Sequence, residues 1–246
     1  MMNNKRRVML ITGAAGGIGR ATVQLFSEKG WVVIGVDRNE FGEDFPSDGL
    51  FIRADISEPS NLEVIYDAVN KFTGNLDAVV NNAALQVVKP LLETTVEEWD
   101  AVMASNLRSV FLGAKLAYPL LKNRGGGAIV NVSSVHAIAT SAGVGSYAAS
   151  KGGLLALTRS MAIEFAQDNI RVNAILPGAV DTPMLSAHLD QVRLENLAKR
   201  TVNGRIGLPL ELAHAIYFLA DEEQSSFMTG QSIVVDGGAT AKLSTE

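Results

Sequence analysis

The chain has 246 residues, a formal net charge of -5 and a mean hydropathy of +0.17, and 47% of its residues are hydrophobic. This size and balance predict one domain, residues 1–246, built around one large core, and the negative charge argues against nucleic acid as a partner. The absence of cysteine excludes disulfides, thiolate nucleophiles and cysteine-bound metal, and it fits a reducing compartment.

The three histidines, His136, His188 and His214, do not have the spacing of a metal-binding motif, so we expect no metal. No stretch approaches the ~18 consecutive apolar residues of a membrane span. The apolar run from Val8 to Ile11 is interrupted by Thr12-Gly13 well short of the length of a secretory signal. We therefore expect a soluble, cytoplasmic protein without a membrane partner.

Short apolar runs rich in β-branched residues alternate along the chain with stretches of helical spacing. The expected strands are Val8 to Ile11, Trp31 to Val36, Leu50 to Ile52, Ala78 to Val80, Ala128 to Val132, Val172 to Leu176 and Ser232 to Val235. The expected helices are Ile18 to Lys29, Leu62 to Phe72, Leu107 to Leu121, Ser150 to Ala166 and Leu210 to Ala220. This alternation predicts an α/β fold of the Rossmann type, doubly wound, with a seven-stranded parallel sheet and helices on both faces. Ligands of such sheets bind beyond the carboxyl ends of the strands.

Two segments depart from this regular alternation. Pro119 lies inside a helical pattern, where it is expected to kink or end the helix. Residues 179–207 follow the sixth strand and form a long segment of mixed polarity without strand signals. Such a segment is typical of a mobile lid with short helices, and we expect it to cover the substrate.

A glycine-rich turn follows the first strand directly and leads into the first helix. It reads Thr12-Gly-Ala-Ala-Gly-Gly-Ile-Gly19, and Arg20 follows where a triphosphate-binding loop would have Lys-Ser or Lys-Thr. Glycines permit the tight turn and a close approach to a pyrophosphate, and the helix N-terminus offers oriented N–H groups. The expected cofactor-binding residues of this turn are Gly13, Ala15, Gly16, Gly17, Ile18 and Gly19.

Asp37 ends the second strand, 18 residues after Gly19. An acidic side chain at this spacing can accept hydrogen bonds from the adenosine ribose and would repel a 2′-phosphate, which favours NAD over NADP. Arg38 is adjacent and could contact a phosphate, so an NADP-preferring enzyme is the alternative.

Tyr147 and Lys151 lie four residues apart at the start of a helical stretch, so their side chains project from the same face. An ammonium near a phenol favours the phenolate, and we expect it to lower the tyrosine pKa from about 10 toward physiological pH. Such a phenol can exchange a proton with an alcohol oxygen.

The motifs together resemble the short-chain dehydrogenase/reductase family in its single-domain form, from about Val8 to Gly238. The family's T-G-x-x-x-G-x-G matches the turn from Thr12 to Gly19, its Asn-Asn-Ala matches residues 81–83, and its Tyr-x-x-x-Lys matches Tyr147 and Lys151. The resemblance implies that Ser134, thirteen residues before Tyr147, is the catalytic serine rather than Ser133, and that Asn106 is the asparagine of a proton relay, positioning a water that links Lys151 to solvent.

In the implied reaction, hydride passes between NAD(H) and the carbinol carbon of a secondary alcohol or ketone. Ser134 hydrogen-bonds the substrate oxygen, and Lys151 also holds the nicotinamide ribose. Further cofactor contacts implied by the resemblance are Asp55 and Ile56 at the adenine, Asn82 and Ala83 of the Asn-Asn-Ala motif, and Pro177, Gly178, Val180 and Thr182 at the carboxamide. Residues 235–238 resemble the family's last strand, often near a subunit interface, which suggests a homotetramer or homodimer.

Gln86 and His136 are candidate substrate contacts, because both follow family motifs and carry polar side chains. They favour a polyol, a sugar or a hydroxy acid as the small-molecule substrate. A hydrolase elbow around Ser141 is discounted, since the preceding strand is expected to end near Val132. A lyase or epimerase is a weaker alternative, because many such relatives are longer. The main rival is a non-catalytic, NAD-binding regulator, which the intact Tyr147, Lys151 and Ser134 argue against.

Overall fold

A computed structural model describes residues 6–187 and 191–242 of the chain, and within them the seven predicted strands form one parallel sheet. The strand order is β3-β2-β1-β4-β5-β6-β7. The strands are β1 (Val8–Thr12), β2 (Val32–Asp37), β3 (Leu50–Arg53), β4 (Ala78–Asn81), β5 (Gly127–Val132), β6 (Ile170–Pro177) and β7 (Ser232–Val235). Each lies within two residues of its predicted bounds, because a strand buried on both faces is an almost continuous apolar run.

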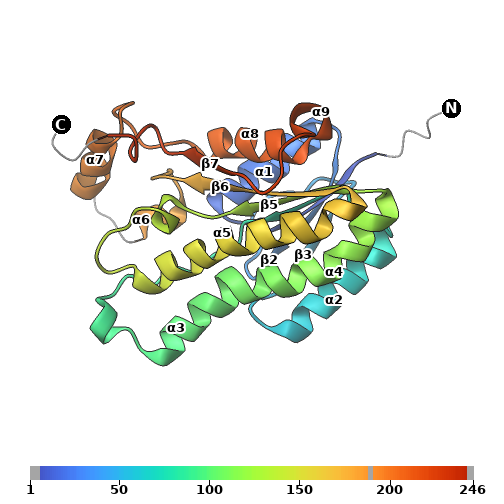
Figure 1. Ribbon diagram of the computed structural model, residues 1–246, viewed down its shortest axis with the longest axis horizontal. Coiled ribbons are helices and arrows are strands. Elements are labelled where there is room, and N and C mark those ends of the chain that lie inside the picture. The colour runs from blue at the N-terminus through green and yellow to red at the C-terminus, as the bar shows by residue number, and fades with distance from the viewer. Residues whose placement is uncertain (1–5, 188–190, 243–246) are drawn as a thin grey trace.

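Helices cover both faces of the sheet, as predicted (Figure 1). On one face lie α2 (Pro59–Phe72), α4 (Ser109–Arg124) and α5 (Gly145–Phe165), and on the other lie α1 (Gly17–Glu28) and α8 (Pro209–Ala220). Shorter helical elements are α3 (Val96–Met103), α6 (Pro183–Ser186), α7 (Gln191–Arg200), α9 (Glu222–Ser225), the 3-10 turns η1 (Leu91–Glu93), η3 (Val135–Ala137) and η4 (Ala166–Asp168), and a π-helical turn η2 (Ala104–Arg108).

Two apolar cores hold the layers together, one on each face. Leu10, Val79 and Ile129 point toward α2, α4 and α5, whereas Met9 and Val80 point toward α1 and α8. This division follows from the alternation of side chains along a strand, in which successive residues face opposite sides of the sheet. The packing of both cores therefore sets where each strand ends along the sheet, and so where the loops after the strands lie.

Of the two expected effects of Pro119, a kink or an end of the helix, the second does not occur, because α4 continues through Pro119 to Arg124. Pro119 lies on the exposed side of the helix. The carbonyl of Lys115, which loses its partner there, also belongs to an exposed residue, so water can replace the missing hydrogen bond.

A buried polar chain ties the central strands to α5. The Asn81 amide donates to Oδ1 of Asn131 at 2.8 Å, and the Asn131 amide donates to the Thr158 hydroxyl at 2.8 Å. Buried polar groups that are fully paired in this way favour one relative placement of their elements. The chain of bonds sets α5 against β4 and β5. None of the helices in the described part of the chain is both long and apolar enough to cross a membrane.

Candidate active site

A cavity of about 1320 Å³ lies along the carboxyl ends of the strands, where the direction of winding changes between β1 and β4. Almost all residues predicted as site residues line it. They include the turn after β1, Asp37, Asp55, Ile56, Asn82, Ala83, Gln86, Ser134, His136, Tyr147, Lys151, Pro177, Gly178, Val180 and Thr182. Gly19 and Asn106 do not line the cavity.

The turn after β1 is shaped so that only glycine fits at two positions. Gly13 has a φ of +68°, and a Cβ there would lie 2.8 Å from Cα of Ala83. A Cβ on Gly19 would lie 2.0 Å from the Gly13 carbonyl oxygen. Gly19 therefore packs the turn against α1 instead of facing the cavity. No side chain caps the N-terminus of α1, so the first N–H groups of the helix, at Gly17 and Ile18, remain available at the cavity wall.

Asp37 braces the same turn. Its Oδ2 accepts from the Ala15 N–H at 3.0 Å and its Oδ1 accepts from the Asn39 N–H at 2.9 Å. Each carboxylate oxygen can accept a second hydrogen bond, so the group can still receive ribose hydroxyls from the cavity. Arg38 lines the cavity beside it, and its guanidinium has no partner among residues 6–187 and 191–242.

Asn82 joins the ends of β1 and β4. Its amide donates to the carbonyls of Thr12 at 3.1 Å and Gly13 at 3.0 Å, and the N–H of Ala83 donates to the Thr12 hydroxyl at 3.2 Å. Both amide protons of Asn82 are thus used within the protein. Asn82 supports the glycine turn directly, which the sequence motif alone did not indicate.

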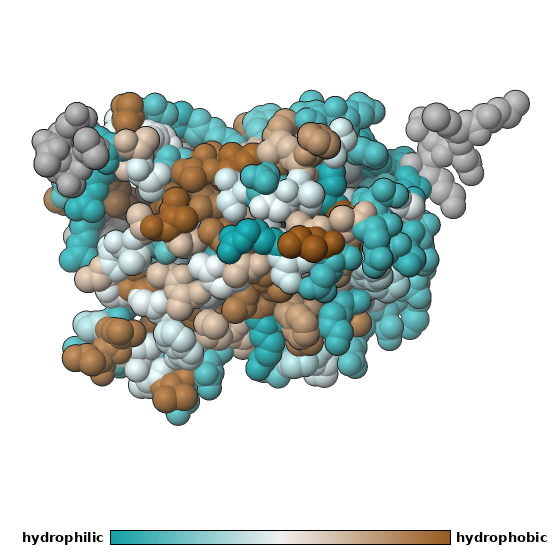
Figure 2. Space-filling model, in the orientation of Figure 1, coloured by the Kyte–Doolittle hydropathy of each residue, from teal (hydrophilic) through white to brown (hydrophobic). Residues whose placement is uncertain are grey.

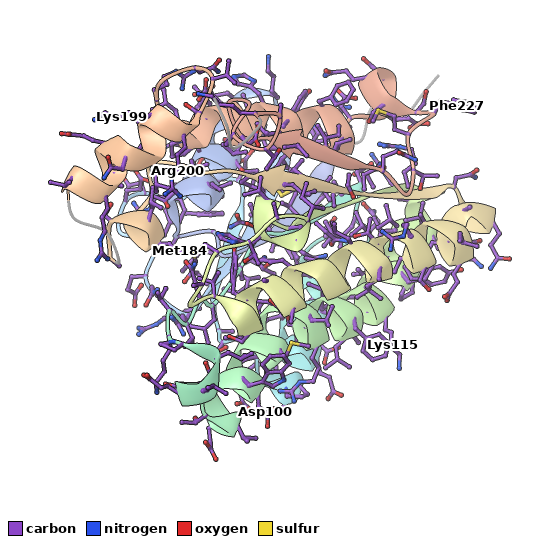
Figure 3. All side chains as sticks on the ribbon, turned by 60° about the vertical axis from the view of Figure 1, so that its left-hand side comes forward. Asp100, Lys115, Met184, Lys199, Arg200 and Phe227 are labelled. Atoms are coloured by element: carbon purple, nitrogen blue, oxygen red, sulfur yellow. The ribbon has the colours of Figure 1, made fainter. Side chains whose placement is uncertain are left out.

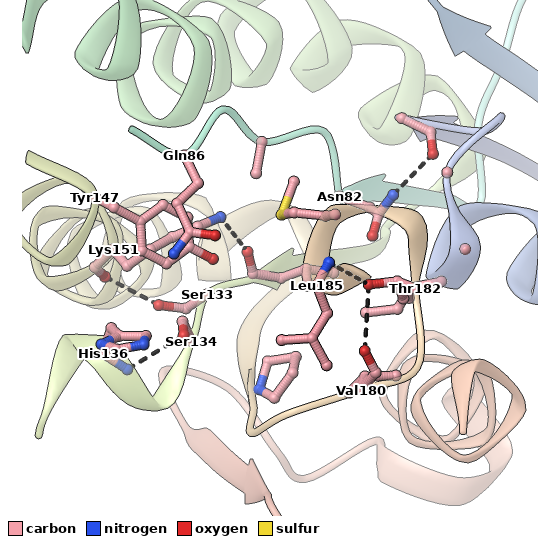
Figure 4. Close-up of a pocket in the computed structure, with 18 of the residues that line it drawn as sticks. Asn82, Gln86, Ser133, Ser134, His136, Tyr147, Lys151, Val180, Thr182 and Leu185 are labelled. Carbon is pink, nitrogen blue, oxygen red and sulfur yellow. Dashed lines mark hydrogen bonds between the residues drawn. The ribbon is translucent and has the colours of Figure 1, made fainter. Parts of the chain in front are cut away.

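Tyr147 and Lys151 lie in the first two turns of α5 and face the cavity (Figure 4). The Lys151 ammonium donates to the Val132 carbonyl at 2.8 Å and lies 5.6 Å from the centre of the Tyr147 ring. Ser134 lies close enough to the phenol of Tyr147 to favour its deprotonated form. Ser133 instead donates to the Lys151 carbonyl at 3.0 Å, so it braces α5. This contrast favours Ser134 over Ser133 as the residue at the reacting oxygen.

Burial dominates the protonation of the pair. Tyr147 is 8% exposed and Lys151 is 2% exposed. Burial raises the pKa of Tyr147 to about 12, against the opposing hydrogen bond from Ser134, and burial lowers the pKa of Lys151 to about 7. The expectation that Lys151 lowers the tyrosine pKa is therefore wrong for the protein by itself. The ammonium faces the ring and a backbone carbonyl, and its own charge is disfavoured by the same loss of water.

Asn106 acts behind the cavity wall, in the π-helical turn. Its Oδ1 accepts from the Leu85 N–H at 2.7 Å, and its amide donates to the Leu85 carbonyl at 2.9 Å and to the Ser150 hydroxyl at 3.0 Å. Ser150 in turn donates to the Tyr147 carbonyl at 2.7 Å. The Asn106 side chain thus connects the segment after β4 to the first turn of α5.

His136 and Gln86 both face the cavity (Figure 4). Nδ1 of His136 lies 3.0 Å from the Thr140 hydroxyl, and the ring makes an edge contact with Tyr147 at 5.9 Å between centres. Burial lowers the pKa of His136, which favours a neutral imidazole able both to donate and to accept a hydrogen bond.

The loop after β6 passes close to the glycine turn. A Cβ on Gly17 would lie 2.7 Å from the methyl group of Thr182, and Thr182 also caps α6 by accepting from the Leu185 N–H. Cavity residues from the predicted lid include Met184, Leu185, Leu197, Lys199 and Arg200. Residues 188–190 of the lid, and with them His188, lie outside the described residues.

Three cationic residues of the cavity, Lys199, Arg200 and Lys242, were not predicted. The only signal was a Lys-Arg pair at the end of a helical stretch, which is equally common on solvated surfaces. Within residues 6–187 and 191–242, no three histidine, aspartate or glutamate side chains gather closely enough to hold a metal ion.

The family described as "Enoyl-(Acyl carrier protein) reductase" matches residues 13–240. The 3-oxoacyl-[acyl-carrier-protein] reductase FabG of Thermotoga maritima is 39% identical over 96% of this chain and 99% of the relative. The cis-4-hydroxycyclohexanecarboxylate dehydrogenase of Sinomonas cyclohexanicum is 38% identical over 96% of this chain and 97% of the relative.

Solved structures agree with these relatives. The ligand-free aldohexose dehydrogenase of Thermoplasma acidophilum superposes with a TM-score of 0.90 at 30% identity, over 98% of this chain and 96% of the other. ElxO with NADP bound superposes with a TM-score of 0.89 at 26% identity, over 97% of this chain and 100% of the other. The chain therefore belongs to the short-chain dehydrogenase/reductase family, the nicotinamide-dependent oxidoreductases of alcohols and ketones.

Proposed function

We propose that the chain interconverts a secondary alcohol and its ketone with NAD(H). The observation that carries this proposal is the convergence of three groups on one cavity: the Tyr147 phenol with Ser134 beside it, the buried Lys151 ammonium, and the uncapped N-terminus of α1. A phenol and a hydroxyl at a cavity wall can hold a carbinol oxygen and move its proton.

The cavity fits a dinucleotide. Gly16 and Gly17 carry no side chain beside the first N–H groups of α1, which leaves room for a diphosphate there. The bound nicotinamide supplies the hydride acceptor or donor. Lys151 would hold ribose hydroxyls, Asp55 and Ile56 would border the adenine, and the loop with Pro177, Gly178, Val180 and Thr182 would border the carboxamide.

Tyr147 and Lys151 would move the proton that the substrate oxygen gains or loses. Because burial keeps Tyr147 protonated, the phenol is ready to donate a proton to a carbonyl oxygen that is being reduced. In the oxidative direction the phenol must first lose its proton, and positive charge beside it favours that loss. Lys151 supplies this charge when it is an ammonium, and its pKa of about 7 lets it exchange protons near neutral pH.

Asn106 serves the pair mainly as a positioning residue. It fixes the first turn of α5 through Ser150, and both protons of its amide are engaged. A water that relays protons to Lys151 would therefore bind an oxygen of Asn106 rather than its amide protons.

Asp37 supports NAD as the cofactor. Its carboxylate is held at the cavity wall by two backbone N–H groups, where a 2′-phosphate would meet its negative charge. The second candidate is an NADP-preferring ketone reductase. It is favoured by the Arg38 guanidinium in the same wall, which has no partner among the described residues, and by the NADP held by ElxO.

A polyol, a sugar or a hydroxy acid is the proposed substrate class. Gln86 and the neutral His136 offer polar contacts close to Tyr147, and the names of two similar proteins refer to an aldohexose and a hydroxycyclohexanecarboxylate. The lid of residues 179–207 would contribute the remaining contacts, since Met184, Leu185 and Leu197 line the cavity from it.

We propose that the chain forms a homotetramer or a homodimer. Phe111 on α4 and Ile163 on α5 are exposed, and an apolar groove between these helices is lined by residues including Leu107 and Leu157. Hydrophobic residues also gather around β7 (Figure 2), where Val234 is exposed. Apolar faces of this kind suit subunit contacts. Phe111→Asp should shift sedimentation toward smaller species, and an unchanged assembly would refute this face as an interface.

The experiment that tests the activity is an absorbance assay for NADH formation with a panel of sugars, polyols, hydroxy acids, steroids and simple secondary alcohols. Turnover of a secondary alcohol supports the proposal. Tight NAD binding without turnover of any compound would instead favour the non-catalytic regulator.

A further inference from the structure

Three cationic side chains that the proposed hydride transfer does not use face one end of the cavity. Lys199 and Arg200 lie in the last turn of α7, and Lys242 follows β7. All three are exposed, and none forms an ion pair within the described residues. Figure 3 shows Lys199 and Arg200 at the same end of the molecule as Met184, which also lines the cavity.

Among the described residues, acidic side chains line the cavity at one edge of the sheet only. Asp37 ends β2 and Asp55 follows β3 at that edge, where Arg38 also lines the cavity, whereas Lys242 follows β7 at the opposite edge. No described lining residue at the α7 end is acidic. Asp236 lies nearby in sequence, but its carboxylate accepts from the Gly238 and Thr240 N–H groups and from the Thr240 hydroxyl.

This local positive charge runs against the net charge of -5 of the whole chain. Cations near the last turn of a helix interact favourably with its carbonyl end, which accounts for Lys199 and Arg200 as helix residues. This helix effect does not account for Lys242, which follows β7 and lines the same cavity.

We infer that the substrate carries an anionic group, which Arg200, Lys199 and Lys242 bind while the carbinol lies at Tyr147. A guanidinium matches the two oxygens of a carboxylate or phosphate, and the two ammonium groups add attraction without fixed geometry. This inference rests on the proposed function and narrows its substrate class to acidic compounds, hydroxy acids among them. The diphosphate of the cofactor would have a site of its own at the α1 N-terminus, where Gly17 packs against Thr182.

The test compares an acid with its neutral ester. The probes are cis-4-hydroxycyclohexanecarboxylate and its methyl ester, and the variants are Lys199→Gln/Arg200→Gln and Lys242→Gln. The matched control is Lys71→Gln, which removes an exposed cation from the last turn of α2, away from the cavity. We expect the double variant to raise KM for the acid about tenfold and to change KM for the ester less than about twofold, because only the acid loses charged contacts.

The dependence of KM on ionic strength is a second measurement, and destabilisation of α7 by the substitutions would not produce it. KM for the acid should rise with ionic strength in the wild type and much less in the double variant, because screening acts only where the charges remain. Equal losses for acid and ester, or effects matched by Lys71→Gln, would overturn the inference.

Measurements of anion binding test this inference independently of whether the protein turns over any alcohol. Calorimetry with cyclohexanecarboxylate and with phosphate, each added to the protein saturated with NADH, measures anion affinity without turnover. Weaker binding by the variants supports the inference even if no alcohol in the panel reacts, and unchanged binding overturns it. NADH affinity, followed by fluorescence, should stay within about twofold of the wild type. A loss of NADH affinity with an unchanged preference for acid over ester would assign the three cations to the cofactor and overturn the inference.

Discussion

Replacing Lys151 with methionine removes an ammonium from a fully enclosed position while keeping most of the side chain's volume. Lys151 is 2% exposed, and its Nζ donates to the Val132 carbonyl. Burial lowers the pKa of Lys151 from its ordinary value of 10.5 to about 7. Between these two values the unfolded chain binds more protons at this residue than the folded protein does. The stability of the wild type must therefore rise with pH across this window.

The lowered pKa of Lys151 corresponds to a loss of roughly 5 kcal/mol in the free energy of unfolding at low pH. About 2 kcal/mol of this loss disappears between about pH 7 and about pH 9, because the folded protein loses its proton there while the unfolded chain keeps it. The methionine variant lacks this titration. It also leaves the Val132 carbonyl without its donor, which costs about 1 to 3 kcal/mol at any pH and cancels when two pH values are compared. The stability of the variant relative to the wild type should therefore fall by about 2 kcal/mol from neutral to alkaline pH.

Urea unfolding followed by circular dichroism, at several pH values across this range, measures the difference. Lys71→Met is the control, because it makes the same substitution at an exposed position and should leave the pH dependence of the wild type unchanged. A difference between wild type and Lys151→Met that stays constant over this range would show that burial does not perturb Lys151, and it would remove the basis for a lysine that exchanges protons near neutral pH.

Three further predictions concern the reaction. Tyr147→Phe should lower kcat by roughly a thousandfold with NADH affinity nearly unchanged, because it removes the proton donor and one hydrogen bond with Ser134. Ser134→Ala should lower kcat by roughly a hundredfold, because it removes the second group at the reacting oxygen. Asp37→Ala should raise kcat/KM with NADP relative to NAD, because the charge that repels a 2′-phosphate is lost. Steady-state kinetics with both cofactors, and NADH fluorescence for binding, measure these effects.

The controls are matched residue by residue. Tyr66→Phe makes the same change at another buried tyrosine, whose pKa burial also raises. It should retain full turnover because Tyr66 belongs to α2 and is buried in the core, and it does not line the cavity. Ser133→Ala should cost about 1 kcal/mol of stability through its lost bond to the Lys151 carbonyl, with a smaller effect on kcat than Ser134→Ala. Equal effects at Ser133 and Ser134, or an enzyme that already prefers NADPH, would contradict these assignments.

The sheet could be predicted from the sequence because each of its strands is an apolar run that must be buried on both faces. The positions of the helices were harder to predict from the sequence. Helix α3 was not expected, although Thr95 and Glu98 form a capping box that a search for this pattern would have found. Helix α5 begins at Gly145, five residues before its expected apolar spacing, because its first turn consists mainly of small residues and carries the site. The π-helical turn has no local sequence signal, and its Asn106 side chain bonds to Leu85 and Ser150, which are distant in sequence.

The candidate site also has features that are local in sequence and features that depend on contacts between distant segments. The turn after β1 and the Tyr147–Lys151 pair are local in sequence, so spacing predicted their place. The bracing role of Asn82 depends on the meeting of β1 and β4, and the cationic end of the cavity depends on α7 meeting the segment after β7. The pKa of Tyr147 depends on how much water the fold removes, and proximity to Lys151 alone gave the wrong direction.

Direct transfer of hydride from the substrate carbon to the nicotinamide can be followed with an isotope. A secondary alcohol from the substrate panel is labelled with deuterium at the carbinol carbon and incubated with the protein and NAD, and the nicotinamide is then analysed by NMR. We expect the deuterium to appear at C4 of the nicotinamide in the wild type, and transfer to be almost absent in Tyr147→Phe although NADH still binds. Deuterium released to solvent, or transfer that is unchanged in Tyr147→Phe, would contradict the proposed reaction.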